Sequence, residues 1–206
     1  MPIPEPGSRI PRRGGALRTA LGRAILRLTG WRIESAPPDQ SKLVVLAAPH
    51  SSNWDFILGI ALVFALRLDL HFIGKAELFR GPLRPLMRRL GGLPVDRRRP
   101  EGFVDQTVAM FRERESLLLA VAPEGTRKPV RRWKSGFYRI ALGAGVPIVP
   151  GYFDNGRKAM GFGPALVPTG DIEADIEKLR AFYAPIPRRG APVSATSSSS
   201  RPASSP

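Results

Sequence analysis

The chain has 206 residues, of which 43% are hydrophobic and 24% charged, a composition typical of one globular domain. It contains no cysteine, which excludes disulfides, thiolate nucleophiles and cysteine-ligated metal sites, and its two histidines argue against a multi-histidine metal centre. The net charge of +15 predicts a polyanionic partner: nucleic acid, an anionic membrane surface or a phosphorylated substrate. A G/C-rich coding sequence is an alternative source of the arginine excess.

Residues 1–30 are expected to form a flexible leader followed by a short, basic amphipathic helix. Prolines at positions 2, 4, 6 and 11 disfavour a helix at the start. Residues 16–28 then have apolar side chains at helical spacing. These side chains are Leu17, Leu21, Ala24, Ile25 and Leu28. Such a helix either packs on the core or lies in the headgroup region of an anionic membrane.

Strands and helices are expected to alternate through residues 31–187. The expected strands are 42–48, 70–74, 93–96, 117–122 and 146–153. The expected helices are 56–66, 103–115, 137–143 and 172–183, with a further helical segment at 77–90 that Gly81, Pro82 and Pro85 interrupt. This alternation predicts an α/β domain with a mostly parallel central sheet flanked by helices.

The two ends of the sequence and its longest apolar run indicate where in the cell the protein is located. Residues 188–206 are rich in Ser and Pro and are expected to be a disordered tail. The longest apolar run, 56–66, is shorter than the roughly 18 to 20 residues that span a bilayer. With no recognisable signal peptide, the sequence favours a protein held peripherally at the cytoplasmic face of the inner or plasma membrane.

His50 and Asp55 are the first candidates for catalysis, because they follow the expected strand 42–48. Catalytic groups gather at the carboxyl ends of parallel strands. There, an aspartate can fix the histidine tautomer and leave the other ring nitrogen as a general base. The structural alternative is that Asp55 complements the amino end of the next helix and that Ser52 is its cap.

A second charged cluster follows the expected strand 117–122. It consists of Glu124, Gly125, Thr126 and Arg127. Glycine allows a ligand to approach the backbone, and arginine offers a fork for phosphate oxygens, although the Glu and Arg could equally form a structural ion pair. Arg97 follows another strand and is a third basic candidate.

Four motifs in this order resemble those of the glycerolipid acyltransferases typified by 1-acylglycerol-3-phosphate acyltransferase. They are His50-Ser51-Ser52-Asn53-Trp54-Asp55, Gly91-Gly92-Leu93-Pro94-Val95-Asp96-Arg97, Glu124-Gly125-Thr126-Arg127 and Val146-Pro147-Ile148-Val149-Pro150. Pro94 stands where the family has Phe. The resemblance implies the α/β fold of the glycerol-3-phosphate acyltransferases.

The resemblance also implies a role for each motif. It makes His50 the general base and Asp55 the group that orients it. The residues that would bind the acceptor are Arg97, Glu124, Gly125, Thr126, Arg127 and Lys75, and those on the acyl-donor side are Val146, Pro147 and Pro150.

The function that follows is transfer of an acyl group from acyl-coenzyme A or acyl-carrier protein to the hydroxyl of a lysophospholipid, with 1-acylglycerol-3-phosphate as the first candidate. No cofactor, metal or nucleic acid is expected, and the partners are the thioester donor or its carrier protein, the acceptor and an anionic membrane surface. The alternatives are another lyso-lipid acceptor, a hydrolase with the same dyad, and a basic nucleic-acid-binding protein. The basic segments carry few aromatic side chains for base stacking, which disfavours the last.

Overall fold

A computed structural model of the chain describes residues 3–48, 53–74, 79, 81–94, 100–124 and 133–187. Its strands are β1 (Arg32–Ile33), β2 (Lys42–Ala48), β3 (Leu70–Gly74), β4 (Gly92–Pro94), β5 (Leu117–Val121), β6 (Ile148–Asp154) and β7 (Ala159–Phe162). Its helices are α1 (Ala16–Thr29), α2 (Asn53–Ala65), the 3₁₀ turn η2 (Gly81–Leu83), α3 (Arg84–Arg89), α4 (Pro100–Glu113), α5 (Gly136–Ala144) and α6 (Ile172–Tyr183).

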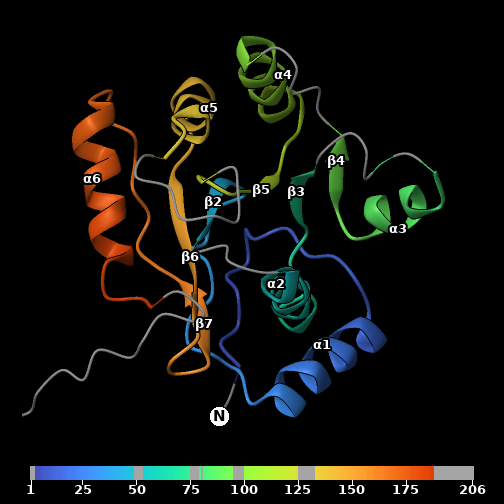
Figure 1. Cartoon of the computed structure of the whole chain (residues 1–206). Coiled ribbons are helices and arrows are strands. Elements are labelled where there is room, and N and C mark those ends of the chain that lie inside the picture. Colours follow the sequence, from blue (N-terminus) through green and yellow to red (C-terminus); the bar gives the residue numbers. More distant parts are fainter. Residues whose placement is uncertain are drawn as a thin grey trace, which may run out of the picture.

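The strands form one seven-stranded sheet in the order β1-β7-β6-β2-β5-β3-β4 (Figure 1). Every neighbouring pair is parallel except β6 and β7, which are antiparallel. The predicted α/β class with a mostly parallel central sheet is therefore confirmed.

The central strands are buried on both faces, which explains their continuous apolar sequences. In β2, Leu43 and Val45 pack on one side of the sheet, and Val44, Leu46 and Ala48 pack on the other. The first side is covered by α1 and α2, and the second by α4, α5 and α6 (Figure 1). No helix in the described part of the chain is both long enough and apolar enough to cross a membrane.

Strands β1 and β7 were not expected from the sequence, because they are short and lack a clear alternation of apolar and polar side chains. The side chain of Ser35, just after β1, holds this edge together: its hydroxyl donates to Phe162 O and accepts from Phe162 N, both at 2.7 Å. Gly161 lies beside it, and a Cβ there would come within 2.5 Å of Ser35 Oγ.

The described part of the leader differs from the expected mobile segment. Ile10 is only 3% exposed and packs in the core beneath α1 and α2. Backbone hydrogen bonds of 2.8 Å join Arg13 N to Arg67 O and Asp69 N to Pro11 O. The prolines prevent a helix, as expected, but they leave an extended chain that pairs with the turn after α2.

Helix α1 packs on the protein through a face other than its leucine stripe. Leu17, Leu21 and Leu28 are 85%, 51% and 87% exposed, whereas Gly22 and Leu26 are buried. Gly22 explains the choice of face: a Cβ there would lie 2.6 Å from Ala61 O in α2, so only glycine allows the two backbones to come this close. The alternative of packing on the core is confirmed for the helix, but Leu17, Leu21 and Leu28 of its stripe are left uncovered.

Candidate active site

Four parallel strands bring their carboxyl ends to one edge of the sheet (Figure 1). The strand pairs are in close register there: Leu46 of β2 is level with Val121 of β5, and Gly74 of β3 is level with Pro94 of β4. Every candidate in the first three motifs, and Lys75, follows one of these strands in the sequence. The topology therefore places the carboxyl ends of β2, β5, β3 and β4 side by side, as a shared site requires.

Six of the predicted site residues lie outside the described residues. They are His50, Lys75, Arg97, Gly125, Thr126 and Arg127. Their roles stay predictions.

Two carboxylates mark the same edge and are buried. Asp55, in the first turn of α2, is 1% exposed, and Glu124, three residues after β5, is 3% exposed. Carboxyl side chains are rarely buried unless the protein provides partners for them, so neither residue is a solvated surface charge. For Asp55, the first turn of α2 suits both the orienting role and the helix-terminus alternative.

The chain leaves β5 and returns at nearly the same place. Lys134 N donates to Pro123 O at 2.9 Å, so the residues that flank the 125–132 segment are tied together. Trp133 then packs edge-on against Phe137 and Tyr183, with ring centroids 6.1 and 5.6 Å away. A cluster of packed aromatic side chains therefore begins directly after the segment that carries Arg127.

Tyr183 is a residue whose role the sequence did not reveal. From the last turn of α6, its buried hydroxyl lies 3.1 Å from Leu46 O and 3.0 Å from Gly151 O, so its one proton is shared between these carbonyls of β2 and β6. Burial, together with the charge of Glu124, raises the pKa of Tyr183 well above its ordinary value of 10, so the hydroxyl keeps its proton. The spacing of Tyr183 from Leu179 shows that it belongs to the apolar face of α6, but only the fold shows which atoms its hydroxyl contacts.

The fourth motif is divided between the middle of the sheet and its far edge. Val146 and Pro147 precede β6, and Pro147 O accepts from Val44 N at 2.9 Å, near the amino end of β2. Ala48 is four residues beyond Val44, about 13 Å along the strand. The structure therefore does not bring Val146 and Pro147 to the edge that carries Asp55 and Glu124, and a position on the acyl-donor side stays a prediction for them.

Pro150 lies within β6, opposite Leu46. Ile148 N donates to Leu166 O, on the side of β6 away from β2. The nitrogen of Pro150, two residues on, faces the same way, so the proline costs no hydrogen bond to β2.

His71 lies at the start of β3, away from the carboxyl edge. Its Nδ1 is 3.2 Å from Gly91 O, and its Nε2 is 3.5 Å from Asp69 Oδ1. The interaction with His71 lowers the pKa of Asp69. This histidine therefore has a structural role. Among the described residues, no group of three or more His, Cys, Asp or Glu side chains could hold a metal ion.

The comparisons with known proteins bear directly on this arrangement. The sequence model of the Acyltransferase family matches residues 32–154, which run from β1 to the end of β6. The chain belongs to the acyltransferase family. The matched span includes all four motifs in full, from His50-Ser51-Ser52-Asn53-Trp54-Asp55 to Val146-Pro147-Ile148-Val149-Pro150. The expectation of an O-acyltransferase is thus confirmed at the level of the family.

The fold agrees with this assignment. The chain is similar to the crystal structure of the 1-acyl-sn-glycerophosphate (LPA) acyltransferase PlsC from Thermotoga maritima, with a TM-score of 0.55 and 21% sequence identity. The similarity covers 82% of this chain and 79% of that one. A comparison with curated proteins finds no match.

Proposed function

We propose that this acyltransferase moves a fatty acyl group from an acyl thioester to the free hydroxyl of a lysophospholipid, with 1-acylglycerol-3-phosphate as the first candidate acceptor. The observation that carries the proposal is that the strands preceding His50, Arg97 and Glu124 in the sequence, β2, β4 and β5, run parallel in one sheet, with Asp55 and Glu124 buried. The family match and the fold shared with PlsC support the same reaction class.

In the proposed mechanism, His50 accepts the proton of the acceptor hydroxyl while Asp55 holds the histidine in the required tautomer. The hydroxyl oxygen attacks the thioester carbonyl and forms a carbon–oxygen bond. The tetrahedral intermediate then collapses, the carbon–sulfur bond breaks, and the thiolate takes the proton from His50. No acyl-enzyme forms, and the reaction needs no cofactor or metal.

Acceptor binding in this proposal depends on charge. Arg97 and Arg127 bind the phosphate of the acceptor, with Lys75 and the Glu124-Gly125-Thr126 turn beside them. The donor is acyl-coenzyme A or acyl-carrier protein, on the side to which the resemblance assigns Val146, Pro147 and Pro150. Both substrates are bound within one site, which lowers the entropic cost of bringing them together.

The enzyme would work peripherally at a lipid surface, on its cytoplasmic face. Exposed apolar side chains on the two helices that cover one side of the sheet support this. On α2, whose first turn lies at the site edge, Trp54 and Ile57 are 37% and 42% exposed, and the leucine stripe of α1 is more exposed still. An apolar surface next to a site for lipids suits attachment to a bilayer.

The decisive experiment measures acyl transfer by the purified full chain, with labelled acyl-coenzyme A and acyl-carrier protein as donors and a panel of lyso-lipids as acceptors. His50→Ala, shown to be folded by circular dichroism, should lower kcat about 10²- to 10⁴-fold, the usual contribution of a general base. Release of free fatty acid without a new diacyl lipid would show hydrolysis instead. No transfer to any acceptor would contradict the proposal.

A further inference from the structure

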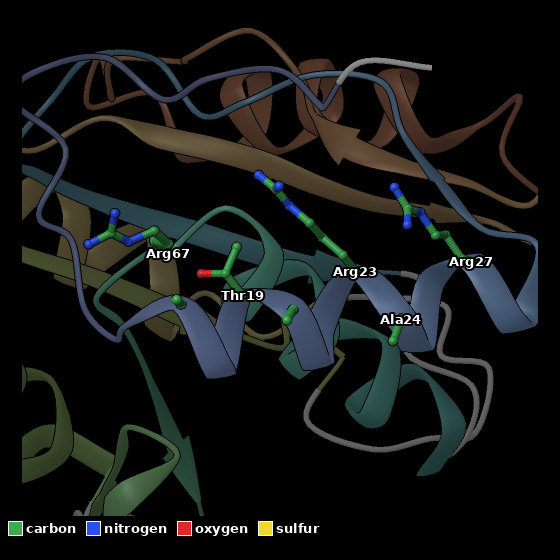
Figure 2. Close-up of a pocket in the computed structure, with 7 residues that line it drawn as sticks. Thr19, Arg23, Ala24, Arg27 and Arg67 are labelled. Atoms are coloured by element: carbon green, nitrogen blue, oxygen red, sulfur yellow. The ribbon is translucent and has the colours of Figure 1, made fainter.

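An arginine-lined groove runs along α1 and reaches Arg67 in the turn that follows α2, on the face of the molecule that α1 and α2 cover. Its volume is about 540 Å³. Figure 2 shows Arg23 and Arg27 extending from the same side of the helix, with Arg67 near its first turns and Thr19 between. The small side chains of Ala16, Ala20 and Ala24 complete the lining. Three guanidinium groups therefore surround a space that no large side chain fills.

None of these three arginines has an acidic partner within the described part of the chain, where every salt bridge involves other side chains. Among the residues that the structure describes, no acidic one lines the groove. Like charges that share a groove repel each other, so the arrangement favours an anion that can accept from several guanidinium groups at once. A phosphate group meets this requirement, because its oxygens match the fork of arginine.

The backbone at Arg67 gives an independent indication that its side chain matters. Helices α1, α2 and α5 all end in the same pattern of backbone hydrogen bonds, with one residue in the left-handed conformation. Two of them use glycine there, Gly30 with φ 73° and Gly145 with φ 64°. Helix α2 uses Arg67, with φ 57°. Glycine would fit this position with less strain, so the arginine is present at a conformational cost that a function for its side chain would explain.

The leucine stripe borders the groove on the same helix. Leu17 and Leu28, at 85% and 87% exposed, project about a quarter turn from Arg27 on the outer surface of α1. Apolar side chains that can enter the acyl region of a bilayer, next to cations at headgroup level, are the pattern of an interfacial helix. The apolar border distinguishes the groove from a site for a free anion or for an acidic protein surface.

We propose that Arg23, Arg27 and Arg67 bind the headgroup phosphate of an anionic phospholipid in a bilayer, while Leu17, Leu21 and Leu28 enter the lipid beside it. This lipid is an anchor and not a substrate, because the arginines predicted to hold the acceptor phosphate, Arg97 and Arg127, follow β4 and β5 at the sheet edge. The proposal rests on the proposed function only for the statement that the protein works at a lipid surface.

The test is sedimentation of the full chain with vesicles of phosphatidylcholine containing about a quarter phosphatidylglycerol, at physiological ionic strength. One cation near an anionic surface contributes about fivefold to affinity, so Arg67→Gly should weaken binding about fivefold, and Arg23→Ala/Arg27→Ala about thirtyfold. Arg67→Gly is the sharper variant, because it relaxes the backbone while it removes the charge.

The matched control is Arg112→Ala/Arg139→Ala. It removes one charge from α4 and one from α5, the helices that cover the opposite side of the sheet. It should bind the same vesicles within twofold of the unaltered chain. If this control loses as much affinity as Arg23→Ala/Arg27→Ala, the attraction comes from net charge alone and the groove has no special role. Unchanged binding by both groove variants would also overturn the proposal.

Two further arms identify the occupant. Inorganic phosphate at about 10 mM should not displace the chain from vesicles. Displacement would assign the groove to a free anion. Binding of a purified acidic acyl-carrier protein that the groove variants lose, while they keep their vesicle binding, would assign it to a protein partner.

Activity separates this proposal from the proposed function. With a short-chain lyso-lipid below its micellar concentration, the groove variants should transfer acyl groups at the rate of the unaltered chain. If the unaltered chain binds vesicles through the groove but transfers nothing, the proposed function fails and the anchor stands. If transfer is normal but vesicle binding does not depend on any of the three arginines, the anchor proposal is wrong and the proposed function is unaffected.

Discussion

Helices α1 and α6 are both amphipathic and of similar length, yet they use their apolar stripes in opposite ways. Helix α6 turns Leu179 and Tyr183 into the core and buries Asp175 completely. Helix α1 leaves Leu17, Leu21 and Leu28 in solvent and packs on α2 through Gly22 and Leu26. The difference teaches that an apolar stripe does not by itself identify the packed face of a helix, because a glycine that allows close backbone approach can decide the contact instead.

The largest effect that should distinguish the two helices comes from truncating one leucine in each. Leu179→Ala empties a site that is 3% exposed and should lower the free energy of unfolding by about 3 kcal/mol. Leu28→Ala, at an 87% exposed position, should change it by less than about 0.5 kcal/mol. Urea denaturation of the two variants makes the comparison. Equal losses would mean that the stripe of α1 is packed in the protein.

Gly22→Ala tests whether close backbone approach determines the docking of α1. The added Cβ would lie 2.6 Å from Ala61 O and 2.7 Å from Ala65 N, so the helices must separate. Overpacking of this kind costs about 2 kcal/mol, although alanine favours the helix itself. Gly15→Ala, where the added Cβ meets no atom within 4 Å, is the control. A stabilised Gly22→Ala variant would contradict the packing of α1 described above.

Asp175 should make the anchoring of α6 sensitive to acid. Its burial opposes ionisation, but hydrogen bonds from Thr169 N, Thr169 Oγ1 and Tyr138 Oη outweigh this and lower the pKa of Asp175 from 3.8 to about 2. A lowered carboxyl pKa stabilises the fold above the ordinary value, and this stability is lost as the pH falls through the folded-state value.

Asp175→Asn should therefore lower the free energy of unfolding at neutral pH by about 2 kcal/mol, since several bonds to a charged acceptor are lost. Its unfolding free energy should then fall less steeply than that of the unaltered chain between about pH 4 and pH 2. Unfolding curves at a series of pH values test both statements. Parallel pH dependence in the two proteins would show that Asp175 is not the group responsible.

The smallest effect expected within α6 is that of Tyr183→Phe. The variant keeps the ring that packs on Trp133 but loses the hydroxyl that bridges Leu46 O and Gly151 O, which should cost about 1 kcal/mol. Because these carbonyls belong to the two strands beside the site, kcat should also fall while the KM for the donor stays nearly constant. An unchanged stability would mean that water or another donor replaces the hydroxyl.

The sequence predicted the sheet well where its strands are buried on both faces. Residues 42–48 were expected as a strand and form β2 with the same bounds, because only apolar side chains suit a strand covered on both sides. Strand β3 was also predicted with its observed bounds, 70–74. Helix α2 begins at Asn53, three residues before the expected start, within the first motif. Strands β1 and β7 were missed because two and four residues carry too little pattern.

The candidate site was predicted partly by order along the chain and partly by resemblance. Asp55 and Glu124 are buried in the segments that follow β2 and β5, while their roles stay predictions. Val146 and Pro147 lie toward the other edge, because residues that precede a parallel strand enter the sheet at its amino end.

By itself, the sequence determined the class of fold, the order of its principal elements and the family, because burial on both faces, helical periodicity and motif spacing are all local patterns. Only the tertiary structure decided which face of α1 is packed, what the hydroxyl of Tyr183 reaches and that Arg67 lies beside Arg23 and Arg27. The physical reason is that periodicity specifies which side chains share a face, whereas the surface that covers this face comes from residues far away in the chain. For α1 that surface was Ala61 and Ala65 of α2, against which a glycine fits and a leucine does not.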